Sequence, residues 1–420
     1  MTTTVPHTSR LLSTSRGFRA MFAASAISST GDGVRLAAFP LLALSVTSDP
    51  VAVTGLAIAN RAPWLLVSLF SGALADRYNR RVLMVLVDIL RAGVAGVLVL
   101  ALLSGADALV ILYVVAVLLG IGETLFTTAS QGLLPDYVPT EHLAKANGNL
   151  FTAQMVGSNF LGPMLGSWLF GLGRAVPFII DAISFAVGSS LLALAPSTTA
   201  PRNKADGASM LKEIREGIIW VWRHPLLRSF LMVVTVVNLT QSASQSLLVL
   251  LAVKELGMST SAFGFLLAAS GVGAFLGGML SSRVGDRLGV PLILLPSIAA
   301  TCPLFLTIAW TDQPLVLGAV LAVNSFLGLL ANVQMSALRQ RIVPREYLGR
   351  VASVNMFCAF GFAIPLGALG GGLLAQYTST RLVYAGSAVV ILALVLAVAT
   401  SMRPSAVRKT IEQLSTREGD

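Results

Sequence analysis

Apolar segments long enough to cross a lipid bilayer follow one another along almost the whole chain of 420 residues. Spanning the hydrocarbon core takes about 20 mainly apolar residues per helix. Charged residues make up only 11% of the sequence, whereas an average soluble domain has about 25%. In lipid, every backbone polar group needs an internal partner, which leaves helices and closed barrels as the possible spanning structures. Because the apolar runs are long and do not alternate strictly, they predict helices.

These runs predict about twelve membrane-spanning helices in two sets of six. The first set comprises 18–46, 50–75, 82–104, 107–133, 142–172 and 174–196. The second set comprises 226–253, 259–281, 289–310, 314–338, 346–375 and 380–402. Between the sets lies the most polar stretch of the chain, which begins as a proline-containing linker. Its part from Met210 to Trp222 has the pattern of an amphipathic helix at the membrane surface, or of a surface helix packed on helix ends.

Lysine and arginine are distributed very unevenly between the two sides that these spans define. One side receives 23 of them, together with both termini, and the other side receives only Arg174, Lys254 and Arg381. The positive-inside rule therefore predicts that both termini are cytoplasmic. The net charge of +10 belongs to this topology and does not indicate a nucleic-acid partner. We expect four parts: an N-terminal bundle at 1–196, a cytoplasmic linker at 197–225, a C-terminal bundle at 226–402 and a cytoplasmic tail at 403–420.

Two motifs occur twice at nearly the same separation. Gly72–Arg81 reads GALADRYNRR, and a weaker copy, GMLSSRVGDR, begins 206 residues later at Gly278 (278 − 72). Val138–Lys145 reads VPTEHLAK and matches the segment VPREYLGR, which begins 205 residues later at Val343 (343 − 138). Two unrelated motifs that repeat at one spacing indicate an internal duplication. The acidic residue in each copy of the second motif suits the positive end of the following helix, and simple helix capping is the alternative explanation.

The first motif resembles the signature between helices 2 and 3 of the major facilitator superfamily, and the resemblance covers nearly the whole chain. It implies two six-helix bundles around a central cavity, each an inverted pair of three-helix repeats. It also implies a cytoplasmic gate in which Asp76 contacts the start of a helix of the other half, near Tyr347. The motif residues expected in this gate are Gly72, Asp76, Arg77, Arg80 and Arg81. Arg80 and Arg81 could instead serve only to set the membrane topology. The second copy has Ser282 at the position that matches Asp76, which implies that only the first copy acts as a gate.

A segment of helix 5 resembles the antiporter signature of proton-driven exporters. Ser158–Ser167 reads SNFLGPMLGS, which matches the signature only in part. Gly162 and Gly166 share one helix face and allow another helix to approach closely, while Pro163 permits a bend. Ordinary tight packing is the alternative explanation.

Apart from residues close to the span ends, seven ionisable residues fall inside the predicted spans, where charge is costly and usually faces the bundle interior or a water-filled path. They are Asp32, Arg35, Arg61, Asp88, Arg91, Glu123 and Asp181, all in the N-terminal half. Asp32 and Arg35 are three residues apart and can pair on one helix face, as can Asp88 and Arg91. The second pair is nearer the cytoplasmic end, so we assign it to bracing the gate.

The other five of these residues are candidates for proton coupling or substrate binding. Glu123 has no basic neighbour on its helix, and an isolated carboxyl group in low dielectric favours its neutral form, as a proton carrier requires. For Glu123 and Asp32, a structural ion pair is the alternative. Arg61 would bind an anionic substrate or neutralise Asp32, and Asp181, near the outer end, is a weaker candidate.

The C-terminal half offers neutral polar groups in place of charges. Asn238, Gln241 and Gln245 form one helical stripe, and together with Asn324 they are candidates for lining a cavity or for interhelical hydrogen bonds. Aromatic residues in the spans would let such a cavity accept a bulky, mostly apolar solute. These residues are Phe39, Trp64, Phe126, Phe265 and Phe357.

Several classes of chemistry have no sign in the sequence. Cys302 and Cys358 lie in apolar segments, so we expect no disulfide framework. None of the three histidines lies in the interior of a span, no metal cluster is visible, and no phosphate-binding loop for ATP occurs. We expect no enzymatic activity, no cofactor and no metal.

Further text around the motifs is similar to the bacterial macrolide-efflux and siderophore-exporter branch of the superfamily: Gly31-Asp32, Leu211–Gly217 and Leu348–Val351. This resemblance implies a monomeric efflux transporter of the bacterial inner membrane that exports a small amphipathic compound by proton antiport with alternating access. One feature departs from drug exporters of the superfamily, because Leu119 stands ahead of Gly122 where they usually carry an arginine. The alternatives are an exporter of a self-made metabolite such as a siderophore, an importer or lipid flippase, and a non-transporting receptor or scaffold.

Overall fold

The computed structural model describes residues 15–106, 109–196, 225–343 and 354–400, with single residues at 219, 221, 222, 351, 402, 403 and 405. These residues are helical almost throughout, and no strand occurs among them. The chain forms two compact units. The N unit comprises 1–46, 59–205 and 260–268, and the C unit comprises 47–58, 206–259 and 269–420.

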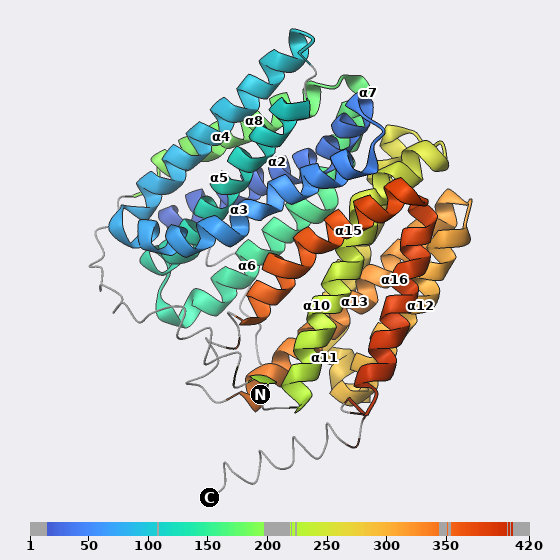
Figure 1. Cartoon of the computed structure of the whole chain (residues 1–420). Helices are drawn as coiled ribbons and strands as arrows, with labels where there is room; N and C mark the ends of the chain where they lie inside the picture. The colour runs from blue at the N-terminus through green and yellow to red at the C-terminus, as the bar shows by residue number, and fades with distance from the viewer. Residues whose placement is uncertain are drawn as a thin grey trace, which may run out of the picture. The chain divides into compact units, whose positions relative to one another are not determined.

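The first six helical segments (Figure 1) begin after residue 15 and end before the linker. They are α2 (Arg16–Val46), α3 (Pro50–Arg77), α4 (Arg80–Leu103), α5 (Leu109–Tyr137), the continuous run α6 (Leu143–Val156), η2 (Gly157–Leu161) and α7 (Gly162–Leu172), and α8 (Val176–Ala193). A short 3₁₀ turn, η1 (Thr140–His142), precedes α6. The middle of the run contains a π-helical turn, η2, which ends two residues before Pro163.

Six further segments occur in the described part of the second half of the chain. They are α10 (Pro225–Val249) with η3 (Leu250–Glu255), α11 (Thr260–Leu288), α12 (Val290–Trp310), α13 (Pro314–Ile342), η4 (Phe357–Ala363) with α15 (Ile364–Tyr377), and α16 (Thr380–Val398). Among the described residues, nine helices are long and apolar enough to cross a membrane. Counting each continuous run once gives twelve segments, so the prediction of an all-α, multi-pass membrane protein is confirmed. Most of the linker at 197–225, with its expected surface helix, lies outside the described residues.

The first charged loop is very short, because α3 ends at Arg77 and α4 begins at Arg80. Asn79 has an extended backbone, and its side-chain oxygen accepts hydrogen bonds from the backbone N–H groups of Arg81 and Val82. These bonds satisfy two of the donors that a helix start leaves free. The loop sequence therefore ends one helix and starts the next within two residues.

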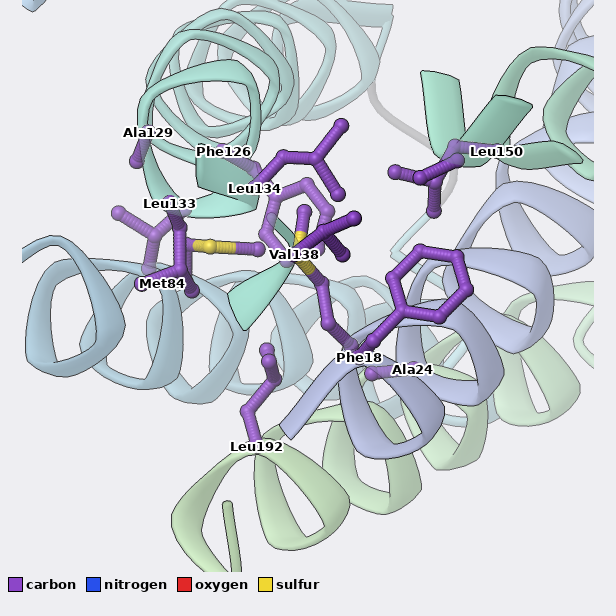
Figure 2. Close-up of a cluster of buried hydrophobic side chains, with 13 residues drawn as sticks. Phe18, Ala24, Met84, Phe126, Ala129, Leu133, Leu134, Val138, Leu150 and Leu192 are labelled. Carbon is purple, nitrogen blue, oxygen red and sulfur yellow. The ribbon is translucent and has the colours of Figure 1, made fainter. Parts of the chain in front are cut away.

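Helix α2 lies at the centre of the N unit and packs against α5, α6, α7 and α8, while α4 packs against α5 and α8. Five helices or their ends contribute to a cluster of buried apolar side chains near the start of α2 (Figure 2). The cluster includes Phe18, Met84, Leu133, Val138, Leu150 and Leu192. Lipid tails are as apolar as these side chains, so their stabilising effect comes mainly from close van der Waals packing.

Glycine pairs bring helices into backbone contact in both units. In the N unit, a Cβ atom at Gly162 would lie 2.6 Å from the Cα atom of Gly33, and Gly166 lies against the carbonyl group of Val34. In the C unit, Gly367 and Gly371 pack in the same way on α10, against the backbones at 239 and 243. The motif at Ser158–Ser167, in the run of α6, η2 and α7, therefore packs closely on α2. Glycines of α15 make the same kind of contact with α10 in the second half of the chain.

Candidate functional site

The seven ionisable residues predicted to lie inside the spans gather into one network in the N unit, which we call the charge cluster. It joins residues of α2, α3, α4, α5 and α8. Its members are Asp32, Arg35, Arg61, Asp88, Arg91, Glu123 and Asp181. Charged groups from five helices of an apolar bundle thus lie together, as intramembrane functional sites commonly require.

Arg35 of α2 lies at the centre of the cluster and contacts three carboxyl groups. Its Nη2 atom lies 2.8 Å from Oδ1 of Asp32 and 3.2 Å from Oε2 of Glu123. Its Nε atom lies 3.5 Å from Oδ2 of Asp181. Its guanidinium also lies 5.7 Å from the centre of the Phe39 ring, within cation–π range. The pairing of Asp32 with Arg35 that their spacing predicts is confirmed.

Arg91 of α4 is the second buried cation and bridges two carboxyl groups. It donates a hydrogen bond to Asp32, and its Nη1 atom lies 3.4 Å from Oδ1 of Asp88. The Ser28 hydroxyl donates a second hydrogen bond to Asp88, at 3.2 Å. The Arg91 guanidinium lies 3.9 Å from the centre of the Phe185 ring. The predicted pairing of Asp88 with Arg91 is confirmed. Both residues belong to the charge cluster, and their bracing of the gate stays a prediction.

The absence of a basic neighbour on its own helix suggests that Glu123 is isolated, but in the structure it has two arginine partners. Both Arg35 and Arg61 approach it, the latter with its Nη1 atom 3.8 Å from Oε1. Arg61 therefore pairs with Glu123, whereas the sequence had suggested Asp32. Three members are partly exposed: the side chains of Asp32, Glu123 and Arg61 are 18%, 24% and 44% accessible. We call these three residues the rim of the cluster.

Asp181 of α8 is fully buried, with an exposed fraction of 0%. Neither of its carboxyl oxygens receives a hydrogen bond within the described part of the chain. Gly31 leaves room for it, since a Cβ atom at position 31 would lie 2.8 Å from Oδ1 of Asp181. The sequence placed Asp181 near the outer end of its helix as a weaker candidate, but its side chain lies in the core of the cluster.

Comparison with known proteins identifies the family. The sequence profile of a family described as transmembrane secretion effector matches residues 12–416. The chain belongs to the major facilitator superfamily. The multidrug efflux pump Tap of Mycolicibacterium fortuitum is 28% identical over 361 residues, which cover 82% of this chain and 86% of the pump. The enterobactin exporter EntS of Escherichia coli O1:K1 / APEC is 27% identical over 379 residues, 86% of each chain.

A solved structure agrees with this assignment. The crystal structure of the nucleoside transporter NupG has a TM-score of 0.70 and 12% sequence identity, and the match covers 92% of this chain and 98% of that one. At this identity, the likeness shows the fold alone. The predicted superfamily fold is therefore confirmed, and the chain is a transporter-family protein and not an enzyme.

The superfamily loop is described only in part. Side chains of Gly72, Asp76 and Arg77 lie outside the described residues, as does Tyr347, the expected neighbour of Asp76. The described part shows Arg80 donating to the Gly132 carbonyl at 2.5 Å. Arg81 donates to the carbonyl groups of Ala193 and Ala195, at 3.1 and 2.5 Å. These cations thus fasten the start of α4 to the ends of α5 and α8, where helix C-termini favour positive charge.

The neutral polar residues of the second half make mainly structural contacts. Asn324 of α13 is buried and donates to Oε1 of Gln241 on α10, at 3.2 Å. Asn238 donates to the Val234 carbonyl of its own helix, at 2.7 Å, and Gln245 is exposed. An interhelical hydrogen bond of the predicted kind therefore joins Gln241 and Asn324, and the cavity-lining role of these residues stays a prediction. Among the described residues, no three His, Cys, Asp or Glu side chains are placed so that they could hold a metal ion.

Sequence reasoning missed the groups that shape the cluster without carrying charge. Gly122 of α5 lies against the aliphatic part of Arg91, where a Cβ atom would stand 2.6 Å from Cγ. Arg91 of α4 thus lies over Gly122 of α5, near the position of Leu119, where drug exporters of this superfamily usually carry an arginine. Phe185 and Ser28 were also missed, because an aromatic ring or a hydroxyl in an apolar helix gives no signal of its partner.

Proposed function

We propose that this protein is a secondary active efflux transporter of the bacterial inner membrane, with both termini in the cytoplasm. It exports a small amphipathic compound in exchange for protons, by alternating access of its two halves. The observation that carries this proposal is the charge cluster, because ionisable side chains are retained inside a membrane bundle chiefly where ions or solutes pass.

The composition of the cluster supports proton exchange. Four carboxyl groups and three guanidinium groups lie together, and Asp32, Glu123 and Arg61 remain partly accessible. Guanidinium groups keep their protons, so a carboxyl group is the only member that can take up or release one. The carboxyl groups outnumber the guanidinium groups by one. The cluster can therefore bind one exchangeable proton without acquiring a net positive charge.

The relatives support export as the direction of transport. One is a multidrug efflux pump and another is an enterobactin exporter, so both drug-like compounds and a self-made siderophore are candidate substrates. We favour an amphipathic drug-like compound. Export of a self-made metabolite such as a siderophore is the second candidate, and its transport would use the same charge cluster.

The test is accumulation of ethidium, chloramphenicol, tetracycline and erythromycin in a pump-deficient bacterial strain that expresses the protein. We expect lower accumulation of at least one compound, and we expect a protonophore to abolish the difference. The matched control is the same strain with an empty vector, and an immunoblot of the membrane fraction verifies expression. Unchanged accumulation of all four compounds by an expressed protein would favour the siderophore candidate, which a purified catecholate siderophore then tests. Inward flux would refute export.

A further inference from the structure

We propose that Asp181 is the carboxyl group that holds the exchanged proton, and that Arg35 changes partners when this proton leaves. The consequence of this inference for transport rests on the proposed function. The location of the proton can be tested without any transport. The chemical class of the ligand is the proton itself, bound at a fully buried aspartate on α8.

The first argument is charge balance. With every member ionised, the four carboxyl groups and three guanidinium groups leave one net negative charge. An unbalanced charge inside an apolar bundle is costly, and one proton on a carboxyl group removes it. The neutral cluster therefore contains three ion pairs and one protonated acid.

The second argument identifies which acid is protonated. An ionised carboxylate is favoured by nearby cations and by donated hydrogen bonds. Asp32 has contacts from two arginines, and so does Glu123. Asp88 has Arg91 and the Ser28 hydroxyl.

Asp181 has the poorest environment for a negative charge among the four acids. Its one ion-pair contact is with the Nε atom of Arg35, at 3.5 Å, and its two oxygens receive no hydrogen bond within the described residues. It is also completely shielded from solvent. A buried carboxyl group that lacks donors is the one that best tolerates the neutral form.

The helices that pack on α8 bring charged side chains of both signs toward Asp181. From α2, the groups that face Asp181 are Arg35 and Asp32, and from α4 they are Arg91 and Asp88. Helix α7 also packs on α8, but its sequence contains no titratable side chain. The charged groups that face Asp181 from α2 and α4 are therefore two arginines and two acids, with Arg35 in direct contact.

Loss of the proton would change the pairing of Arg35. An ionised Asp181 competes with Asp32 and Glu123 for this guanidinium, whose Nε atom has no hydrogen-bond partner in the described structure. A shift of Arg35 toward Asp181 removes one cationic partner from Asp32 and from Glu123, the partly exposed acids of the rim. The negative charge of these two acids is then less neutralised. Proton release in the core is thereby linked to a negatively charged rim that can bind a polar group of the substrate. Arg35 is a positioning residue in this scheme.

The location of the proton can be tested by infrared spectroscopy of the purified full-length protein in liposomes at pH 7. A protonated carboxyl group has a C=O stretching band distinct from that of a carboxylate. We expect the wild type to show one such buried group, Asp181→Asn to lack its band, and Asp88→Asn to keep it. The proposal is overturned if the wild type has no such band, or if Asp88→Asn removes it while Asp181→Asn does not.

The transport consequence is tested with ethidium in proteoliposomes. We expect Asp181→Asn to lose acceleration by a pH gradient and to retain ethidium counterflow, because the neutral amide imitates the protonated acid. Ser190→Ala on the same helix is the control, since Ser190 is exposed and, within the described residues, its hydroxyl donates to the Ala186 carbonyl of its own helix. If the wild type responds to the gradient and Asp181→Asn responds equally, this inference is wrong while the proposed function stands. If wild-type counterflow of ethidium occurs without any response to the gradient, proton exchange itself is wrong, whatever the infrared band shows.

Discussion

Arg91 of α4 lies directly against Gly122 of α5, where a Cβ atom on residue 122 would stand 2.6 Å from the arginine's Cγ atom. This contact lets the guanidinium reach across to Asp32 and Asp88 and lie over the Phe185 ring. A glycine in the middle of an apolar helix thus positions a cation that comes from the neighbouring helix.

Substituting this glycine should lower both stability and transport. We expect Gly122→Ala to destabilise the protein by about 1–3 kcal/mol, because the added methyl group must displace the Arg91 side chain. Thermal unfolding in detergent measures the effect. The control is Gly93→Ala on α4, where a Cβ atom meets nothing within 4 Å and the change should be neutral or stabilising by about 0.5–1 kcal/mol. Equal unfolding temperatures for the two variants would contradict the packing argument.

The two arginines of the charge cluster that differ most in burial should tolerate substitution by lysine very differently. Arg91 is 2% exposed and contacts two acids and a ring, so Arg91→Lys should cost on the order of 3–5 kcal/mol, because an ammonium group cannot reproduce the planar contacts. Arg61 is 44% exposed, and Arg61→Lys should cost about 0–1 kcal/mol. Unfolding temperature and ethidium efflux of both variants provide the measurement. A stable, active Arg91→Lys variant would show that the cluster does not depend on guanidinium geometry.

The rim acid Glu123 should affect substrate binding more than proton exchange. We expect Glu123→Gln to weaken the apparent affinity for ethidium by roughly tenfold or more, which corresponds to the loss of one charge-assisted contact. The response to a pH gradient should remain, because the proton is assigned to Asp181. Proteoliposome assays with ethidium and with uncharged chloramphenicol separate the two effects. Loss of the gradient response in Glu123→Gln, with ethidium affinity unchanged, would make Glu123 the coupling acid.

The sequence could predict the number and type of helices because each span carries its own signal in about 20 consecutive apolar residues. It could also predict the pairs Asp32–Arg35 and Asp88–Arg91, since residues three apart lie on one helix face. Both signals are local and need no knowledge of how helices are arranged.

The assembly of the charge cluster could not be predicted in the same way. Contact between Arg35 and Glu123 joins residues 88 positions apart, and contact between Arg91 and Asp32 joins residues 59 positions apart. These pairs depend on which helix faces meet, and several apolar helices of similar hydropathy give no clue to that choice. For this reason the sequence gives no sign that Arg35 and Arg61 approach Glu123.

The gate assignment of Asp76 remains a prediction and can be tested by a conservative change. Asp76→Asn should strongly reduce efflux of ethidium with little loss of folded protein, since the amide keeps the shape and removes the charge that a helix end would attract. Its counterpart in the second copy, Ser282, is exposed on α11, and Ser282→Ala should leave efflux unchanged. Normal efflux by Asp76→Asn would mean that the loop acts in topology alone.

The glycine motif of helix 5 can be assigned to packing or to proton exchange by comparing both halves of the chain. A Cβ atom at Gly166 would lie 2.8 Å from the carbonyl carbon of Val34, and one at Gly371 would lie 2.8 Å from the carbonyl oxygen of Ala243. If packing is the role, Gly166→Ala and Gly371→Ala should both lower the unfolding temperature, each by the equivalent of about 1–3 kcal/mol.

The neighbouring Gly370 supplies the matched control, because a Cβ atom there meets nothing within 4 Å. Gly370→Ala should therefore unfold at or above the wild-type temperature. A specific antiporter role gives a different result: Gly166→Ala would lose the response of ethidium transport to a pH gradient at an unchanged unfolding temperature, while Gly371→Ala would keep it. Because the two glycines make equivalent backbone contacts in their own units, we expect parallel losses of stability, and the gradient response per folded protein should survive in both variants.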